Sequence, residues 1–339
     1  MKNSNINDKY FCLHANCILV KGHNRSSIID TQWRNIHFIP NSLFYILKQS
    51  RNKTIGWIKS HYNNNPILDD YFNFLIVEEL GMYVDNPKLF PPIKLEYENP
   101  SIITNAIIEY SNASDYDIEN IFFQLSELNC ESVEIRFISN VNVLKLRSLL
   151  KGSHNTSFRS MVLGIPFDES YSVEALMELL EQYLKIDRVH VYKSNNSQIV
   201  RSEYNQPLII YSKQDNIFSS NCGNISPDYF SVCLEIVCES ALYNTCLHRK
   251  VCIAADGSIK NCLSMNKSYG NIKHNTLNDI VKLESFQFFW NIKKDDVKVC
   301  KGCEMRYVCH DCRAYITDTS DVYSKPQKCT YNPYISKWG

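Results

Sequence analysis

The uneven placement of cysteine is the feature that most limits what this chain can fold into. Of the 14 cysteines in 339 residues, four lie in residues 1–232 and ten lie in the last 107 residues. A segment so rich in thiols has little apolar mass per residue, so metal ligation has to supply part of its folding free energy. The change in cysteine density predicts a boundary near residue 230 and a cysteine-rich domain over residues 231–339.

The spacing of the C-terminal cysteines is typical of metal ligands. In the pairs Cys300-x2-Cys303 and Cys309-x2-Cys312, both sulfurs can turn toward one centre. Eight candidate ligands, enough for two four-thiolate sites, are Cys246, Cys252, Cys262, Cys300, Cys303, Cys309, Cys312 and Cys329. Thiolates bind zinc or iron–sulfur clusters, and spacing alone does not separate the two. We expect the other six, Cys12, Cys17, Cys130, Cys222, Cys233 and Cys238, to be small buried apolar side chains.

Charge and hydropathy exclude several classes of protein. The 36 basic and 36 acidic side chains give a formal net charge of zero, whereas a nucleic-acid-binding protein usually carries a basic excess. No run approaches the roughly 18–20 apolar residues that a membrane-spanning helix needs. The polar N-terminal segment, residues 1–8, is followed by no apolar run, so we expect no secretory signal. We therefore expect a cytoplasmic protein without nucleic-acid or membrane partners.

Residues 1–90 are predicted to form a small winged-helix-like module. Short apolar runs predict strands at Tyr10–Leu13, Cys17–Val20 and Ser26–Asp30. The period then changes to that of helices: one begins near Asn41, the second is capped by Thr54, and the third spans residues 67–80. Three strands followed by three helices is the element order of a winged helix.

Residues 100–230 alternate between strand and helix patterns. The predicted strands are residues 102–110, 133–138, 161–167, 189–192 and 208–211, with amphipathic helices between the first four. Such alternation is typical of an α/β fold with mostly parallel strands. Since an eightfold β/α barrel needs at least ~200 residues, we expect a partial barrel or an open sheet here. In the C-terminal domain, a further helix is predicted from Thr276.

The C-terminal cysteines follow a recognisable order: Cys246, Gly257-x4-Cys262, Cys300-x2-Cys303-x5-Cys309-x2-Cys312 and Cys329. This order resembles the SPASM domain, the auxiliary-cluster domain of radical S-adenosylmethionine (radical SAM) peptide-modifying enzymes. Residues 261–272 and 300–315 closely resemble the SPASM protein of grasp-with-spasm systems, which mature ribosomally made peptides (RiPPs). The sequence departs from the SPASM pattern before Cys312, where the usual spacing is one residue longer.

The resemblance implies two 4Fe–4S clusters, and zinc remains the alternative metal. Cys300, Cys303, Cys309 and Cys329 would hold one cluster. The other would be held by Cys246, Cys262 and Cys312, with Cys252 as its fourth ligand.

The motif that binds S-adenosylmethionine in radical SAM enzymes is missing. Those enzymes carry CxxxCxxC in the loop after the first barrel strand. The corresponding loop here, residues 111–117, reads SNASDYD, and the motif occurs nowhere in the chain. Residues 100–230 therefore resemble a degenerate partial radical SAM barrel. We expect no S-adenosylmethionine site and no radical SAM chemistry.

Residues 1–90 resemble the RiPP recognition element, a winged helix that captures a leader peptide as an added edge strand. The expected edge is residues 26–31, with the helix at residues 67–80 as the wall of the groove. The resemblance implies an iron–sulfur protein that binds the leader region of a precursor peptide and acts in its maturation with an ATP-grasp ligase. Whether the chain is itself an enzyme stays open. The alternative is a non-redox adaptor whose metal sites are structural and which presents the peptide to a partner enzyme.

Overall fold

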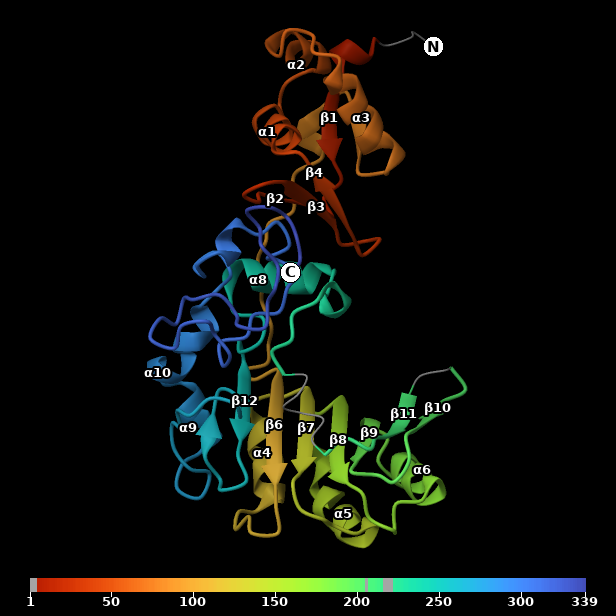
Figure 1. Ribbon diagram of the computed structural model, residues 1–339, viewed down its shortest axis with the longest axis vertical. Helices are drawn as coiled ribbons and strands as arrows, with labels where there is room; N and C mark the ends of the chain where they lie inside the picture. Colours follow the sequence, from red (N-terminus) through yellow and green to blue (C-terminus); the bar gives the residue numbers. More distant parts are fainter. Residues whose placement is uncertain (1–4, 205–206, 216–221) are drawn as a thin grey trace. The chain divides into compact units, whose positions relative to one another are not determined.

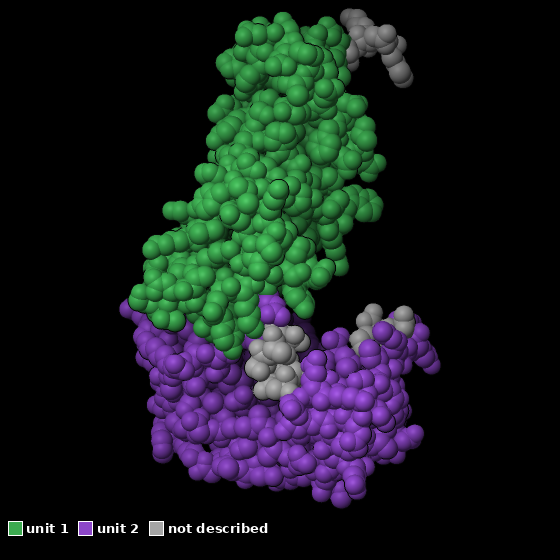
Figure 2. Space-filling model, viewed as in Figure 1, with its two compact units in different colours: residues 1–97, 225–245, 292–339 green, residues 98–224, 246–291 purple. Residues whose placement is uncertain are grey.

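The computed structural model describes residues 5–204, 207–215 and 222–339. Residues 1–4, part of the polar N-terminal segment considered above, lie outside the described residues. The chain divides into two compact units (Figure 2). Unit 1 comprises residues 1–97, 225–245 and 292–339, and unit 2 comprises residues 98–224 and 246–291. The cysteine-rich segment is thus divided between the units, and the division into three domains stays a prediction.

The N-terminal part of unit 1 contains the predicted strands and helices, with two additional strands (Figure 1). The elements are β1 (Tyr10–Leu13), β2 (Cys17–Val20), β3 (Ser26–Asp30), β4 (Asn35–Ile39), α1 (Asn41–Gln49), α2 (Ile55–His61), α3 (Ile67–Val77) and β5 (Gly81–Val84). Thr54 caps α2 as predicted, because its side chain accepts a hydrogen bond from the Trp57 N–H. Helix α3 ends earlier than expected, and the chain turns at Glu79, which has a left-handed φ of 54°.

The strand order shows that the predicted peptide-binding edge is wrong. β3 is the central strand of an antiparallel sheet with the order β2-β3-β4, while β1 pairs with β5 in a separate sheet. Every residue of β3 is buried, all five pair with β4, and the four residues Ser27 to Asp30 pair with β2 as well. A strand that is paired on both sides has no free backbone groups to offer a peptide. The edges of this sheet are β2 and β4, and β4 is a strand that the sequence analysis missed.

Both faces of this sheet are covered within unit 1. On one face, Ile28 packs against the helices in a core with Leu43, Phe72 and Leu75. On the other face, the neighbouring strand residues pack against the cysteine-rich segment and helix α8 (Leu234–Leu242). That second core contains Ile18, Val20, Ile29, Val237, Met305, Val308 and Tyr331. A fragment limited to residues 1–90 would expose this second apolar face to water, so the module is one part of a larger compact unit.

Unit 2 is built on a sheet of eight described strands. Its elements are β6 (Asn105–Tyr110), α4 (Ile118–Glu127), β7 (Ser132–Phe137), α5 (Val143–Leu150), β8 (Ser160–Pro166), α6 (Val173–Gln182), β9 (Ile186–Tyr192), β10 (Gln198–Arg201), β11 (Pro207–Tyr211), β12 (Lys250–Ile253), β13 (Ile259–Lys260), α9 (Leu277–Val281) and α10 (Glu284–Gln287). The order is β10-β11-β9-β8-β7-β6-β12-β13, parallel from β11 to β12 and antiparallel at both edges. The predicted α/β class with mostly parallel strands is confirmed, and the sheet is open.

The two faces of this sheet differ in polarity. Alternate side chains on the parallel strands, such as Ile108, Ile135 and Leu163, are fully buried and form the apolar core. The residues between them include Glu109, Glu134 and Arg136, so the opposite face carries charge. Among the described residues, no helix in either unit has the length and apolar composition required to cross a bilayer.

Candidate metal centres

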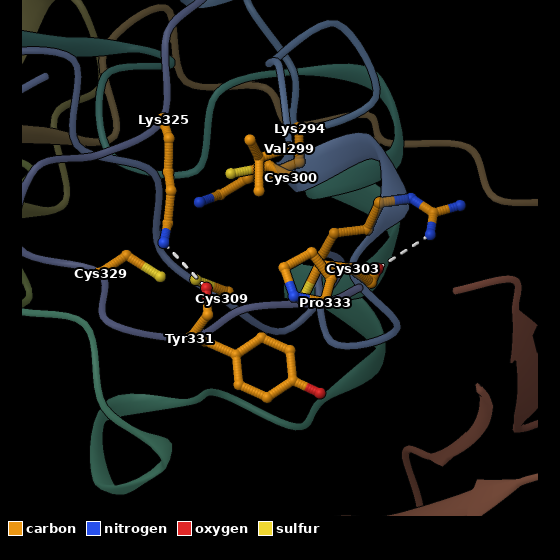
Figure 3. A pocket seen from close by; sticks show the side chains of 10 residues that line it. Lys294, Val299, Cys300, Cys303, Cys309, Lys325, Cys329, Tyr331 and Pro333 are labelled. Atoms are coloured by element: carbon orange, nitrogen blue, oxygen red, sulfur yellow. Dashed lines mark hydrogen bonds between the residues drawn. The ribbon is translucent and has the colours of Figure 1, made fainter. Parts of the chain in front are cut away.

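Four of the eight predicted ligands line one cavity in unit 1. The cavity is small, with a volume of about 20 Å³, and is lined by Lys294, Val299, Cys300, Cys303, Arg306, Cys309, Lys325, Cys329, Tyr331 and Pro333. The sulfurs of Cys300 and Cys329 point into the same space as the Lys294 ammonium (Figure 3). The structure therefore brings together the four cysteines that the resemblance assigns to one cluster.

Local backbone structure sets the position of the first cysteine pair. Residues Cys300–Gly302 form a single turn of 3-10 helix, closed by a 2.8 Å hydrogen bond from the Cys303 N–H to the Cys300 carbonyl. Val299 precedes the turn with a φ of 67°, a conformation that is uncommon for a β-branched residue. This turn brings both cysteines of the pair to the same cavity, as the two-residue spacing predicted.

Buried charges surround this cavity. Asp311 is fully buried and accepts hydrogen bonds from Arg313 Nη2 and from Asn244 Nδ2, each at 2.7 Å. Its Oδ1 atom also lies 3.3 Å from the Nζ atom of Lys294, which is itself buried. Two cations thus share one carboxylate, and the network has a positive net charge. Such a network suits thiolate ligands, whose charge is negative.

The charges in and around the cavity act on one another. Burial alone would lower the pKa of Lys294, but Cys309, Asp311 and Cys300 raise it above its ordinary value. Burial raises the pKa of the Cys309 thiol to about 11, although Lys294 opposes the shift. Burial also raises the pKa of Cys303. Without a metal these thiols keep their protons at neutral pH, so metal binding has to displace them.

A single zinc ion requires closely spaced sulfurs. Sulfurs bound to one tetrahedral zinc at about 2.3 Å lie only about 3.8 Å apart. In the part of the chain that the structure describes, no three Cys, His, Asp or Glu side chains are placed so that they could hold one metal ion. The four cysteines that line the unit 1 cavity therefore do not form a tetrahedral single-ion site in this structure.

Three more predicted ligands lie in unit 2. Cys252 is on β12, fully buried, and its thiol donates to the Asn261 carbonyl at 3.5 Å. Burial alone would lower the pKa of Lys250, but the thiols of Cys246, Cys252 and Cys262 raise it, which places all three near this ammonium group. The eighth predicted ligand, Cys312, belongs to unit 1. It is not among the residues that line the cavity there, and its sulfur accepts a hydrogen bond from the Tyr315 N–H at 3.4 Å.

Sequence reasoning missed two kinds of residue at these sites. Lys294 and Lys325 line the unit 1 cavity, yet neither stands in a motif, and only the fold shows that Lys294 is buried. Cys222 contacts Cys262: a hydrogen bond with Cys222 lowers the pKa of the Cys262 thiol to about 5, while burial opposes this shift. Since 39 residues separate the two in sequence, no spacing rule pointed to the contact.

Residues 111–117 form the loop between β6 and α4, where we expected no cluster that binds S-adenosylmethionine. It contains no cysteine, and its polar side chains bond within unit 2. Ser114 Oγ donates to the Ala255 carbonyl at 2.7 Å, Asp115 forms an ion pair with Lys273, and Asp117 caps α4. The first two of these side chains tie the loop to the segment that carries Cys262.

Comparison with known proteins gives one match to a family model and several similar structures. Three crystal structures of SuiB from Streptococcus suis are similar to the chain. The structure bound to S-adenosylmethionine is 13% identical, with a TM-score of 0.28, and the match covers 90% of this chain and 96% of SuiB. For SuiB alone the identity is 13%, the TM-score 0.29 and the coverage 91% and 95%, and for SuiB bound to the precursor peptide SuiA they are 12%, 0.30, and 91% and 99%. No curated protein matches the sequence. The family match covers residues 245–304, which include Cys246, Cys252, Cys262, Cys300 and Cys303. This segment is therefore a SPASM domain, an iron–sulfur cluster-binding domain.

Proposed function

We propose that this chain is an iron–sulfur protein that binds a ribosomally made precursor peptide and takes part in its maturation beside an ATP-grasp ligase. It performs no radical SAM chemistry of its own, because the loop at residues 111–117 offers no thiolate. The observation that carries the proposal is the cavity lined by four cysteines in a chain with a SPASM domain. The resemblance of residues 261–272 and 300–315 to grasp-with-spasm proteins supports the peptide as substrate.

We assign a 4Fe–4S cluster to each of the two groups of cysteines. Cys300, Cys303, Cys309 and Cys329 hold one in unit 1, and Cys246, Cys252 and Cys262 contribute to the second. A bound cluster supplies one-electron transfer. The chain's own residues supply the thiolates and, through Lys294, a buried positive charge beside them. If the clusters proved redox-inactive, the non-redox adaptor would be the remaining function.

The peptide is expected to bind at the free edge of β4. Among the residues that the structure describes, this strand pairs with β3 alone. Helix α3 lies beside β4. The Nδ1 atom of His37, on β4, is 3.4 Å from Oε2 of Glu78, the residue that follows α3, and the centroid of the His37 ring is 6.3 Å from that of Phe74 on α3. Phe38 is 41% exposed. An added strand would gain backbone hydrogen bonds from β4 and side-chain contacts along α3.

The same sheet is bonded to the loop that carries two cluster ligands. Ser27 Oγ donates to the Glu304 carbonyl at 2.7 Å, and Arg25 Nε donates to Glu304 Oε1 at 2.7 Å. Arg306 Nη1 donates both to the Lys21 carbonyl at 2.6 Å and to the Cys303 carbonyl at 3.0 Å. A peptide bound to β4 would therefore be separated by β4 from β3, the strand whose Ser27 contacts the Cys303–Cys309 loop. This connection gives peptide binding a route to affect the cluster.

Titration of the full-length, anaerobically prepared protein with a labelled leader peptide from a neighbouring small gene tests the peptide role. In an antiparallel edge strand, alternate N–H groups point outward. Proline at one of the two adjacent positions Ile36 and His37 should therefore weaken binding at least tenfold, while alanine at the same position should not. Ile199→Pro, on β10 of unit 2, is the control. Saturable binding that both prolines leave unchanged would contradict the β4 site, and no binding at all would remove the peptide from the proposal.

A further inference from the structure

A second cavity in unit 1 lies outside the sites described above. Its volume is about 290 Å³, close to the lower limit of about 300 Å³ for small-molecule sites. Leu13 on β1, Leu19 on β2 and Leu47 on α1 line it, together with Ile93 and Leu95 in the segment that follows the N-terminal strands and helices. These side chains are only partly buried, so the cavity presents apolar surface that the fold leaves uncovered.

The charges that line this cavity are basic. Lys48 on α1 and Arg51 just after it contribute two cations, and His14 after β1 contributes a ring nitrogen. Among the described residues that line the cavity, none is Asp or Glu. In the part of the chain that the structure describes, neither Lys48 nor Arg51 forms an ion pair. Burial raises the pKa of the lining thiol, Cys17, to about 12, so it adds no negative charge at neutral pH.

Arg51 also holds one wall of the cavity in place. Its Nη2 atom donates to the Phe90 carbonyl at 2.9 Å, and Phe90 is followed by two prolines that lead to Ile93 and Leu95. Because proline fixes its own φ, few backbone conformations are open to this segment. A guanidinium carries several N–H donors, so the bond to Phe90 leaves others for a ligand.

We propose that this cavity binds a small monocarboxylic acid with an apolar chain. The carboxylate lies against Arg51 and Lys48, and the chain lies between Leu19 and Leu47. Charge complementarity selects this ligand class: a carboxylate accepts charge-assisted hydrogen bonds from a guanidinium, whereas an ammonium group would meet two cations and no acidic side chain of the described lining. A small inorganic anion would leave the apolar walls uncovered.

The proposed site is separate from the peptide site and from the metal centres. None of the described residues that line the cavity belongs to β4 or α3, and none is one of the eight predicted metal ligands. The proposal therefore does not depend on the proposed function, and the two can fail independently.

Isothermal titration calorimetry on the full-length, anaerobically prepared protein tests the proposal with octanoate, octylamine and octanol, which share one chain and differ in charge. We expect saturable binding of one octanoate per chain and at least tenfold weaker binding of the other two. Hexanoate should bind more weakly than octanoate, by roughly fourfold for each methylene removed.

Variants of the lining assign the site. Lys48→Met and Arg51→Met should each weaken octanoate binding by about fivefold, while Arg51→Lys keeps the charge and should weaken it less. Lys53→Met is the matched control, because Lys53 lies over the Trp57 ring at 4.9 Å and does not line the cavity. Leu19→Phe should weaken binding by filling part of the space. Since Lys48 is exposed and does not hold the wall, Lys48→Met stays informative if Arg51→Met disturbs the fold.

Three results would overturn the proposal. Equal binding of octanoate, octylamine and octanol would show an apolar gap without selection for charge. Octanoate binding that Lys48→Met, Arg51→Met and Leu19→Phe all leave unchanged would place the acid elsewhere on the protein. No saturable octanoate binding, with binding instead of a peptide that ends in leucine and carries its terminal carboxylate, would replace the small acid by a chain end.

Discussion

Replacing Asp311 by asparagine tests the buried charge network beside the unit 1 cavity. The carboxylate lies 2.7 Å from Arg313 Nη2 and 3.3 Å from Lys294 Nζ, and all three side chains are at least 96% buried. Asparagine keeps the shape and part of the hydrogen bonding but removes the only negative charge in the trio. The two buried cations would then lose the carboxylate that they share.

The size of the effect follows from these distances. At an effective dielectric constant of about 20, a unit charge pair separated by about 3 Å interacts by roughly 5 kcal/mol. Desolvation cancels part of that energy, and removing one partner of a buried pair usually destabilises a protein by about 3–5 kcal/mol. We therefore expect Asp311→Asn to lower the unfolding free energy of unit 1 by about 3 kcal/mol or more, which is roughly a hundredfold change in the equilibrium constant.

Urea unfolding of the anaerobic, cluster-loaded protein measures this change. Loss of cluster absorbance near roughly 400 nm reports on the cluster sites, and circular dichroism reports on the helices. Asp296→Asn is the matched control, because Asp296 is exposed and belongs to the same segment as Lys294. If Asp311→Asn unfolds within about 0.5 kcal/mol of this control, the range of ordinary surface substitutions, our account of the buried network is refuted.

Three further predictions follow from the two units. Lys294→Met should lower the reduction potential of the unit 1 cluster, since it removes a buried cation that favours the more negative, reduced state; an unchanged potential in a redox titration would contradict this. Burial and Arg188 lower the pKa of His190, so stability should fall as pH drops from about 6.5 through the folded pKa. His190→Gln should flatten that dependence in unfolding experiments between about pH 5 and 7, and an unaltered slope would assign it to other groups. Reduced, reconstituted protein should yield no 5′-deoxyadenosine from S-adenosylmethionine above a no-enzyme control, because residues 111–117 contain no cysteine.

Local patterns predicted the elements well. Thr54 caps α2 as expected, and the helix predicted from Thr276 is α9, which Thr276 caps, because a cap depends only on residues within one turn of it. Strands β1 to β3 have the predicted limits, since their periodicity is clear within a few residues. Strand β4 was missed because it follows a tight turn in which Arg34 has a φ of 56°, and its polar Asn35 and His37 weaken the apolar pattern.

The pairing of strands that are distant in the sequence could not be predicted from it. β12 comes from the cysteine-rich segment but pairs in parallel with β6, with Lys250 opposite Asn105, and no periodicity encodes that choice of partner. For the same reason β3 was taken as an edge although β4 covers it. At the sites, the two-residue spacing correctly placed Cys300 and Cys303 at one cavity, because that geometry is local, but it also paired Cys309 with Cys312, which does not line the cavity. The set of four that includes Cys329 came from the resemblance to the SPASM domain. The contact between Cys222 and Cys262 depends on the tertiary fold, so the spacing of cysteines in the sequence does not indicate it.

Metal and sulfide analysis of the anaerobically purified, full-length chain tests the central claim most directly. The claim is that the clustered thiolates of both units hold iron–sulfur clusters. Two 4Fe–4S clusters predict about eight irons and about eight acid-labile sulfides per chain, with little zinc. Both should be halved in Cys303→Ala, which removes a ligand from the unit 1 cavity. About two zinc ions per chain without sulfide would contradict the claim and leave purely structural metal sites.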